Sequence, residues 1–157
     1  MHTPLHVFPN TGPLIPASAS AVILWTASRK YLVQVRDDIP GIFYPGHCGL
    51  IGGAVDAGES YAECAAREMK EEIGLEPSLG LTHFLDMILN FAPLGHGAVE
   101  RVFFECRIAE DILSLARLTE GQRLELVSGE DLLRRYRITP YDAFALWQHW
   151  TIRFGST

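Results

Sequence analysis

Several acidic side chains in residues 53–75 are spaced as the ligands of a divalent metal ion would be. Glu68, Glu71 and Glu72 fall on one side of the segment if it is helical, because each residue turns a helix by roughly 100°. Carboxylate oxygens in this number suit Mg²⁺ or Mn²⁺, which keep several waters and share their sites with substrate phosphates. The spacing therefore predicts a metal site for chemistry on a phosphate-bearing substrate.

The same side chains also fit a simpler interpretation, in which the acids form a solvated helix face. Arg67 and Lys70 would then act as counter-charges, since glutamates three or four positions apart repel by a few tenths of a kcal/mol per pair. The glycines ahead of the helix favour the metal site instead. Gly52, Gly53 and Gly58 allow tight turns, so the backbone can come close to whatever the helix binds.

One helix must position these acids, and its ends can be read from local signals. Ser60 followed by Glu63 forms a capping box, and Gly74 followed by Pro77 is a stop signal. These signals predict a helix over residues 61–73, with a packing face opposite the acidic face. The packing face consists of Ala62, Ala65, Ala66, Met69 and Ile73.

Written as a pattern, residues 53–75 read G-x5-E-x7-R-E-M-x-E-E-x-G-L. The specified positions are Gly53, Glu59, Arg67, Glu68, Met69, Glu71, Glu72, Gly74 and Leu75. This pattern resembles the Nudix box with no position missing, and so many fixed positions make a chance match rare. The resemblance implies a hydrolase for a nucleoside diphosphate linked to another moiety. In that family Mg²⁺ or Mn²⁺ activates a water for attack on a phosphorus of the pyrophosphate.

The resemblance also implies a role for each acidic residue. Carried over by position, the metal ligands are Glu68, Glu71, Glu72 and the carbonyl of Gly53. Glu59 and Arg67 would form a mainly structural pair, in which the arginine orients the glutamates. A carboxylate must also accept the proton of the attacking water, and Glu68 and Glu72 are the catalytic candidates within the box.

Two residues outside the box extend the predicted site. Glu120, in a Thr-Glu-Gly-Gln stretch expected to follow a strand, resembles the loop glutamate of mutator-type members that reaches the metal site. The alternative for this stretch is an ordinary turn. Arg36 ends a predicted strand, and its equivalent in many members faces the substrate phosphates, a task that suits the planar guanidinium. The alternative for Arg36 is a solvated strand end.

The remaining chain reads as strands on both sides of the central helix, followed by two further helices. Strands are expected at residues 19–26, 31–36, 48–55, 81–90, 99–108 and 123–127. Ser128 with Asp131 caps a short helix, and Thr139-Pro140 begins a last helix that continues to about Ile152. This order predicts an α/β protein with an α/β/α sandwich around a mixed sheet, which is also the Nudix fold.

Length and charge agree with one such domain. The 157 residues fit a single domain that buries roughly two-thirds of its unfolded surface. We expect a single Nudix hydrolase domain at residues 19–157, preceded by an irregular arm at residues 1–18. The arm packs either across its own domain or across a second copy in a homodimer. The net charge of −6 argues against non-specific binding to nucleic acid, whereas a nucleotide masked by metal stays compatible.

The chain shows no sign of a membrane or secretory context. The apolar run of residues 22–25 is far too short to span a bilayer, and residues 1–21 do not resemble a signal peptide. The cysteines are odd in number and lack metal-ligand spacing, which favours reduced thiols in a cytoplasmic protein. His83 and His149 are expected at strand and helix surfaces.

Several substrates and two other functions stay open. The substrate classes include nucleoside triphosphates and nucleotide sugars. Mutator-type members that select oxidised guanine use an asparagine late in the chain, and the matching residues 137–140 contain none. One alternative function is isoprenyl diphosphate isomerase-like activity, for which Cys48 would supply a required cysteine. The other is a catalytically silent nucleotide-sensing module, although such sensors often lose the glutamates that this chain keeps.

Overall fold

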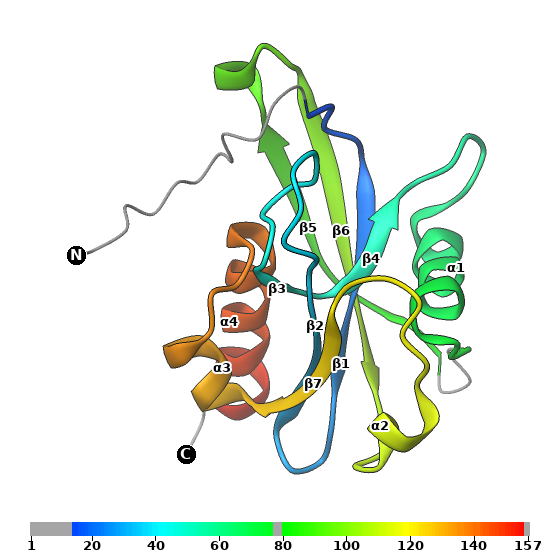
Figure 1. Ribbon diagram of the computed structural model, residues 1–157, viewed down its shortest axis with the longest axis vertical. Coiled ribbons are helices and arrows are strands. Elements are labelled where there is room, and N and C mark those ends of the chain that lie inside the picture. The colour runs from blue at the N-terminus through cyan, green and yellow to red at the C-terminus, as the bar shows by residue number, and fades with distance from the viewer. Residues whose placement is uncertain (1–13, 77–79, 156–157) are drawn as a thin grey trace.

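The computed structural model describes residues 14–76 and 80–155. The strands are β1 (Ala19–Trp25), β2 (Lys30–Val35), β3 (Cys48–Gly49), β4 (Ile51–Ala54), β5 (Thr82–Asn90), β6 (Ala98–Arg107) and β7 (Arg123–Ser128). The helices are α1 (Tyr61–Ile73), α2 (Ile112–Leu115), α3 (Gly129–Arg135) and α4 (Pro140–Phe154), with a 3₁₀ turn, η1, at Ala92–Leu94. The strands form one mixed sheet, with α1 on one face and α3 and α4 on the other (Figure 1). The expected α/β/α sandwich is confirmed.

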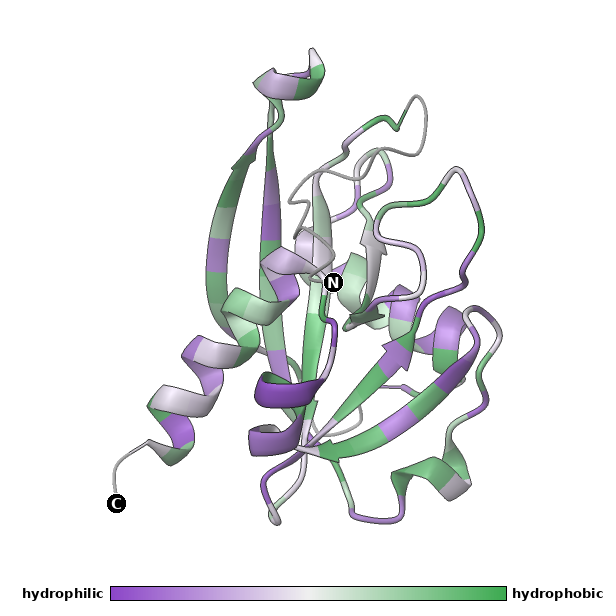
Figure 2. Cartoon of the chain, turned by 60° about the vertical axis from the view of Figure 1, so that its left-hand side comes forward, coloured by the Kyte–Doolittle hydropathy of each residue, from purple (hydrophilic) through white to green (hydrophobic). Residues whose placement is uncertain are grey.

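Strand β1 lies at the centre of the sheet. It pairs in parallel with β6 and antiparallel with β2 and β4. Beyond these neighbours, β5 pairs with β6 at one edge, and β7 pairs with β2 along its whole length. All residues of β1 from Ala19 to Leu24 are buried, and its later part has hydrophobic colour in Figure 2. A strand that is covered on both faces needs such a continuous apolar run.

The strand expected at residues 48–55 is divided into β3 and β4 at Leu50. The reason is that β3 pairs with β2 whereas β4 pairs with β1, so the chain changes neighbours between them. The backbone N–H of Leu50 donates instead to the Asp142 carboxylate at 3.0 Å. The backbone then passes so close to β1 that a Cβ on Gly52 would lie 2.1 Å from the Ser20 carbonyl oxygen.

Helix α1 begins and ends where the sequence predicts. The Ser60 hydroxyl accepts from the Glu63 N–H, and the Glu63 carboxylate accepts from the Ser60 N–H, so both halves of the capping box form. Gly74 ends the helix in the left-handed region at φ 68°, which glycine adopts without strain. Met69 and Ile73 are buried in the core beneath the helix, and this packing fixes the direction of the acidic face.

The sheet separates two apolar cores. The core on the α4 side includes Ala21, Ile23, Tyr31, Phe103, Leu132 and Leu146. The core on the α1 side includes Val22, Leu24, Ile51, Met69, Ile73 and Phe104. Successive side chains of β1 alternate between the two cores, as the pleat of a strand requires. The helix that carries the acids and the helix on the opposite face are therefore anchored to the same strand.

Two short elements were not predicted. Helix α2 and turn η1 are single turns, too short to show a helical period in the sequence. The stop signal at Pro77 and residues 1–13 of the expected arm lie outside the described residues. The assignment of residues 19–157 to a single domain stays a prediction. In the described part of the chain, every helix is too short or too polar to cross a membrane.

His149 corrects an expectation, because it is fully buried rather than placed on the surface of α4. Its Nδ1 lies 2.7 Å from the Tyr31 hydroxyl, and its Nε2 lies 2.7 Å from the Glu105 carboxylate. Arg153 forms an ion pair with the same carboxylate. Burial lowers the pKa of His149 and opposes the effect of Glu105. No local pattern predicts this network, since its members come from β2, β6 and α4.

Replacing Tyr31 by Phe should lower the free energy of unfolding by about 1–3 kcal/mol, because one buried nitrogen of His149 then loses its partner. Tyr61→Phe is the matched control, since the Tyr61 hydroxyl bonds to Glu100 at an exposed position and its loss should cost less than about 0.5 kcal/mol. Urea unfolding monitored by circular dichroism measures both values. Equal losses in the two variants would contradict the stabilising role of the buried network.

Candidate active site

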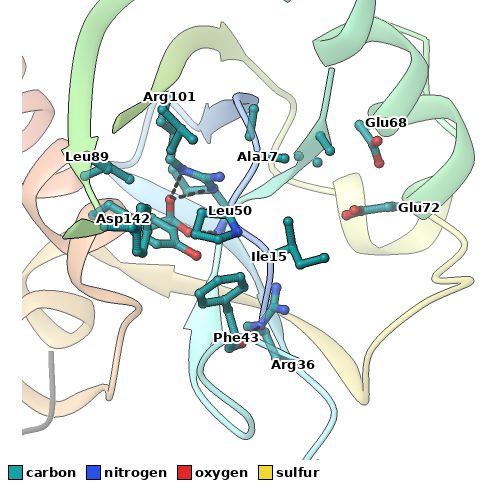
Figure 3. A pocket seen from close by; sticks show the side chains of 18 of the residues that line it. Ile15, Ala17, Arg36, Phe43, Leu50, Glu68, Glu72, Leu89, Arg101 and Asp142 are labelled. Carbon is teal, nitrogen blue, oxygen red and sulfur yellow. Dashed lines mark hydrogen bonds and ion pairs between the residues drawn. The ribbon is translucent and has the colours of Figure 1, made fainter. Parts of the chain in front are cut away.

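A cavity of about 360 Å³ opens between α1 and the start of α4, across the sheet (Figure 3). One wall is acidic and consists of Glu68 and Glu72 from α1 and Glu120 from the loop before β7. We call these three residues the acidic wall. Figure 3 shows Arg101 and Asp142 across the cavity from Glu68 and Glu72. The fold therefore brings together three of the predicted acidic residues from two distant parts of the chain.

Arg67 connects the acids next to this wall. Its Nε and Nη2 donate to the Glu59 carboxylate at 2.8 and 3.0 Å. Its Nη1 donates to Glu68 at 2.7 Å and to Glu71 at 3.0 Å. The hydrogen bond from Arg67, together with one from the Asp56 N–H, lowers the pKa of Glu59 to about 2. The predicted Glu59–Arg67 pair is thus present in the structure, and its orienting effect on Glu68 stays a prediction.

Gly53 brings the backbone of β4 against Glu68. A Cβ at this position would lie 2.4 Å from a carboxylate oxygen of Glu68, so no larger residue fits without moving that side chain. The Gly53 carbonyl accepts a hydrogen bond from the Cys64 thiol at 3.4 Å, and Gly53 itself lines the cavity. The role of this carbonyl as a metal ligand stays a prediction.

Glu72 is the least compensated acid of the site. Its side chain is buried, and its Oε2 has no hydrogen-bond partner. Burial, together with repulsion from Glu68 and Glu120, raises the pKa of Glu72 to about 8. A buried carboxylate oxygen without a partner is unusual. Its burial lowers the stability of the folded state unless the oxygen accepts a hydrogen bond or contacts a cation or a water. Together with the hard oxygen donors around it, this orphaned atom fits a divalent cation.

Glu71 takes a different place from the other box glutamates. Its side chain is 59% exposed, pairs with Arg67 and does not line the cavity. Among residues 14–76 and 80–155, no three Asp, Glu, His or Cys side chains come together as a ready metal-binding cluster. The assignment of Glu68, Glu71, Glu72 and Gly53 as ligands therefore stays a prediction.

The loop that carries Glu120 is fastened on both sides. The loop follows α2 and precedes β7, which corrects the expectation that it follows a strand. On one side, the Thr119 N–H donates to the Glu72 carbonyl at the end of α1, at 2.9 Å. On the other side, the Gln34 side chain donates to the Glu120 carbonyl, and the Gln122 N–H donates to Val35. These bonds tie Glu120 to both α1 and β2 and hold it near Glu72.

Arg36 lines the cavity on a third side, next to Phe43 (Figure 3). Its Nε donates to the Phe43 carbonyl at 2.9 Å, which fixes the direction of the guanidinium. The terminal nitrogens Nη1 and Nη2 are suited to phosphate oxygens. The structure thus places Arg36 where the sequence predicts a substrate contact, and the contact itself stays a prediction.

Sequence reasoning missed the ion pair on the far wall. The Arg101 guanidinium donates to Asp142 through Nε and Nη2, at 3.2 and 2.9 Å, and lies 4.3 Å from the centre of the Tyr141 ring. Asp142 also accepts from the Thr139 hydroxyl. The available signal was the charge on Arg101, which shares one face of β6 with the buried Phe103. Residues 15–17, placed in the irregular arm by the sequence, also line the cavity.

Cys48 lies away from the cavity. It is buried in the core between the sheet and α4, and it is not among the residues that line the cavity. Burial raises the pKa of its thiol to about 11, so the thiol stays protonated near neutral pH. Cys48 is therefore not placed to serve as the cysteine that the isomerase-like alternative needs at the reacting carbon.

The raised pKa of Glu72 predicts how metal-free protein responds to pH. The folded pKa of about 8 exceeds the ordinary value of 4.5, so the protonated form stabilises the folded state. This contribution is complete below pH 4.5 and is lost as the pH rises through 8. Between pH 4.5 and 8, the free energy of unfolding of the unchanged protein should fall by up to about 1.4 kcal/mol per pH unit. Glu72→Gln should remove this decline. Urea unfolding in EDTA measures it, and parallel pH curves for both proteins would contradict this expectation.

Comparisons with known proteins agree with this geometry. A family model described as NUDIX domain matches residues 15–150. Over 63 residues the chain is 38% identical to an uncharacterized Nudix hydrolase of Pseudomonas aeruginosa, a match that covers 40% of this chain and only 37% of that protein. Over 125 residues it is 33% identical to a prenyl-diphosphate phosphatase of Methanosarcina mazei, covering 78% of this chain and 69% of that protein.

A solved structure shows the same fold. The NUDIX domain of Shewanella oneidensis NrtR, in complex with ADP ribose, matches with a TM-score of 0.69 at 16% identity and covers 90% of each chain. Two findings identify a family as well as a fold. They are the family match, which spans most of the chain, and the Methanosarcina relative. The chain belongs to the Nudix family of hydrolases, which act on diphosphate bonds and generally use divalent metal ions.

Proposed function

We propose that this protein is a Mg²⁺- or Mn²⁺-dependent pyrophosphohydrolase that cleaves the diphosphate bond of a nucleoside diphosphate derivative. The observation that carries the proposal is the buried Oε2 of Glu72, which has no hydrogen-bond partner and lies near Glu68 and Glu120. Carboxyl groups that repel one another in this way favour a cation close to them. A diphosphate is itself anionic, so it could approach the acidic wall only together with a cation.

Glu68, Glu71, Glu72 and the Gly53 carbonyl would hold the ion. When bound, the ion would lower the pKa of water, neutralise charge on the pyrophosphate and orient the nucleophile. Arg67 would hold Glu68 and Glu71 in a fixed direction, because it donates to both. Arg36 would bind phosphate oxygens from a third side of the cavity.

The residues of the acidic wall would also handle the proton. In the hydrolysis, the water oxygen forms a new bond to phosphorus, the bond to the bridging oxygen breaks, and one water proton goes to a carboxylate. Oε1 of Glu68 already accepts from Arg67, so this oxygen is engaged within the protein. Glu120 makes no ion pair with an arginine or lysine of the described residues. We therefore assign Glu120 as the general base. Glu68 and Glu72 are the other two catalytic glutamates of the site.

The named relatives support the diphosphate as the common element of the substrates. One relative carries the name prenyl-diphosphate phosphatase, and one solved neighbour holds ADP ribose. Both compounds carry a diphosphate, whereas the groups attached to it differ. A silent sensing module is the weaker alternative, because this chain keeps every glutamate of the box.

The proposal predicts metal-dependent turnover that requires Glu72. Phosphate release would be measured from nucleoside triphosphates, nucleotide sugars and ADP-ribose, with Mg²⁺, Mn²⁺ or EDTA and a coupling phosphatase. Glu72→Gln should lower kcat at least about 100-fold, since it removes a charged ligand. Glu76→Gln is the matched control, because Glu76 follows the same helix, is exposed and pairs with Lys70 outside the cavity. Full activity of Glu72→Gln, or turnover in EDTA, would refute the proposal.

The fastened loop gives a second prediction about activity. Gly121 adopts φ +86°, and a Cβ there would lie 2.8 Å from the Gln34 side chain that holds Glu120. Gly121→Ala should therefore displace Glu120 and lower kcat by about 10–100-fold. Gly80→Ala is the control, since φ is +76° and no atom lies within 4 Å of the added carbon. Steady-state kinetics compare the two, and an equal kcat would show that the loop position does not matter.

A further inference from the structure

A second cavity adjoins the first one. It has a volume of about 280 Å³ and lies between β5 and the start of α4. Leu89, Phe91 and Tyr141 line both cavities, so the two lie side by side. A ligand that reaches the acidic wall with one end can therefore extend into the second cavity with its other end.

The second cavity is almost entirely apolar, and we call it the apolar groove. Besides the three shared residues, its lining consists of Tyr44, Met87, Ile88, Asn90, Pro140 and Phe144. No charged side chain of the described residues contributes to this lining. The amide oxygen of Asn90 already accepts from the Ala92 N–H at 2.9 Å, and Tyr44 is only 4% exposed. The groove thus offers few polar partners to a ligand.

One large apolar side chain of the groove faces water, since Phe144 is 45% exposed. The side chain of Ile88 lies on the other face of β5 from Met87 and Leu89, because successive residues of a strand alternate in direction. The first cavity, at about 360 Å³, is near the lower end of the range of roughly 300–1,000 Å³ for ligand sites. A substrate with a bulky group on its diphosphate would need the additional space.

We propose that the apolar groove binds a hydrocarbon chain attached to the diphosphate of the substrate. This inference rests on the proposed function, because it specifies the group carried by the diphosphate that the acidic wall handles. A nucleobase has several donors and acceptors along its edge, and these would lose water without gaining partners in the groove. A hydrocarbon chain has no such groups and gains from covering Phe144.

The test uses a series of alkyl methylenebisphosphonates, in which a CH₂ replaces the bridging oxygen and prevents cleavage there. Their affinity for the full chain in Mg²⁺ is measured by titration calorimetry as the alkyl chain lengthens. Burial of each methylene should tighten binding by up to about fourfold until the groove is filled. An affinity that does not depend on chain length would overturn the proposal.

Matched variants locate the effect. Phe144→Gln should reduce the dependence of affinity on chain length, with a loss of about tenfold for the longest chain. Leu115→Gln is the control, since Leu115 is 58% exposed on α2 and lines neither cavity. Identical behaviour of the two variants would overturn the proposal. The same follows if a nucleoside analogue, and not the alkyl series, loses affinity in Phe144→Gln.

Turnover separates this inference from the proposed function. Hydrolysis of the corresponding alkyl diphosphates is measured in parallel with the binding series. Chain-length-dependent binding supports the groove assignment even if neither the alkyl diphosphates nor the nucleotide panel is hydrolysed, an outcome that would refute only the hydrolase. Hydrolysis without chain-length dependence would uphold the hydrolase and overturn the groove assignment.

Discussion

The repulsion between closely spaced carboxylates is the constraint around which this site is built. Arg67 offsets Glu59, Glu68 and Glu71 by donating to all three, so most of the negative charge is paired within the protein. Glu72 is left without such a partner and is buried as well. The protein thus leaves one buried carboxyl oxygen without a partner beside the cavity, and a metal ion would be its natural counterpart.

The fold keeps these charges in place through contacts that are not themselves charged. Met69 and Ile73 fix α1 against the sheet, and the missing side chain of Gly53 lets β4 approach Glu68. The Glu120 loop is tied to the end of α1 and to Gln34 of β2. Because α1 and β4 both pack against β1, a shift of the central strand would change the distance between the ligands proposed for the metal.

Local sequence signals were enough for the helix and its acids but not for the walls facing them. The capping box and Gly74 place the ends of α1 because all their partners lie within one turn. The Arg101–Asp142 pair, the burial of His149 and the division at Leu50 each depend on residues more than 40 positions apart. The exposed position of Glu71 was also unforeseen, since helical spacing alone does not reveal which acids Arg67 holds. Periodicity indicates a face, whereas only the folded chain decides what that face meets.

The two faces of the sheet bury charge in opposite ways. On the α4 side, Glu105 is buried and satisfied by His149 and Arg153, and these hydrogen bonds outweigh burial and lower its pKa. On the α1 side, Glu72 is buried and unsatisfied, and its pKa rises. Similar burial therefore has opposite effects on two glutamates, and the difference lies in the partners that the chain supplies. The satisfied network contributes stability, whereas the unsatisfied carboxylate lowers stability and leaves an oxygen available to a ligand from outside the chain.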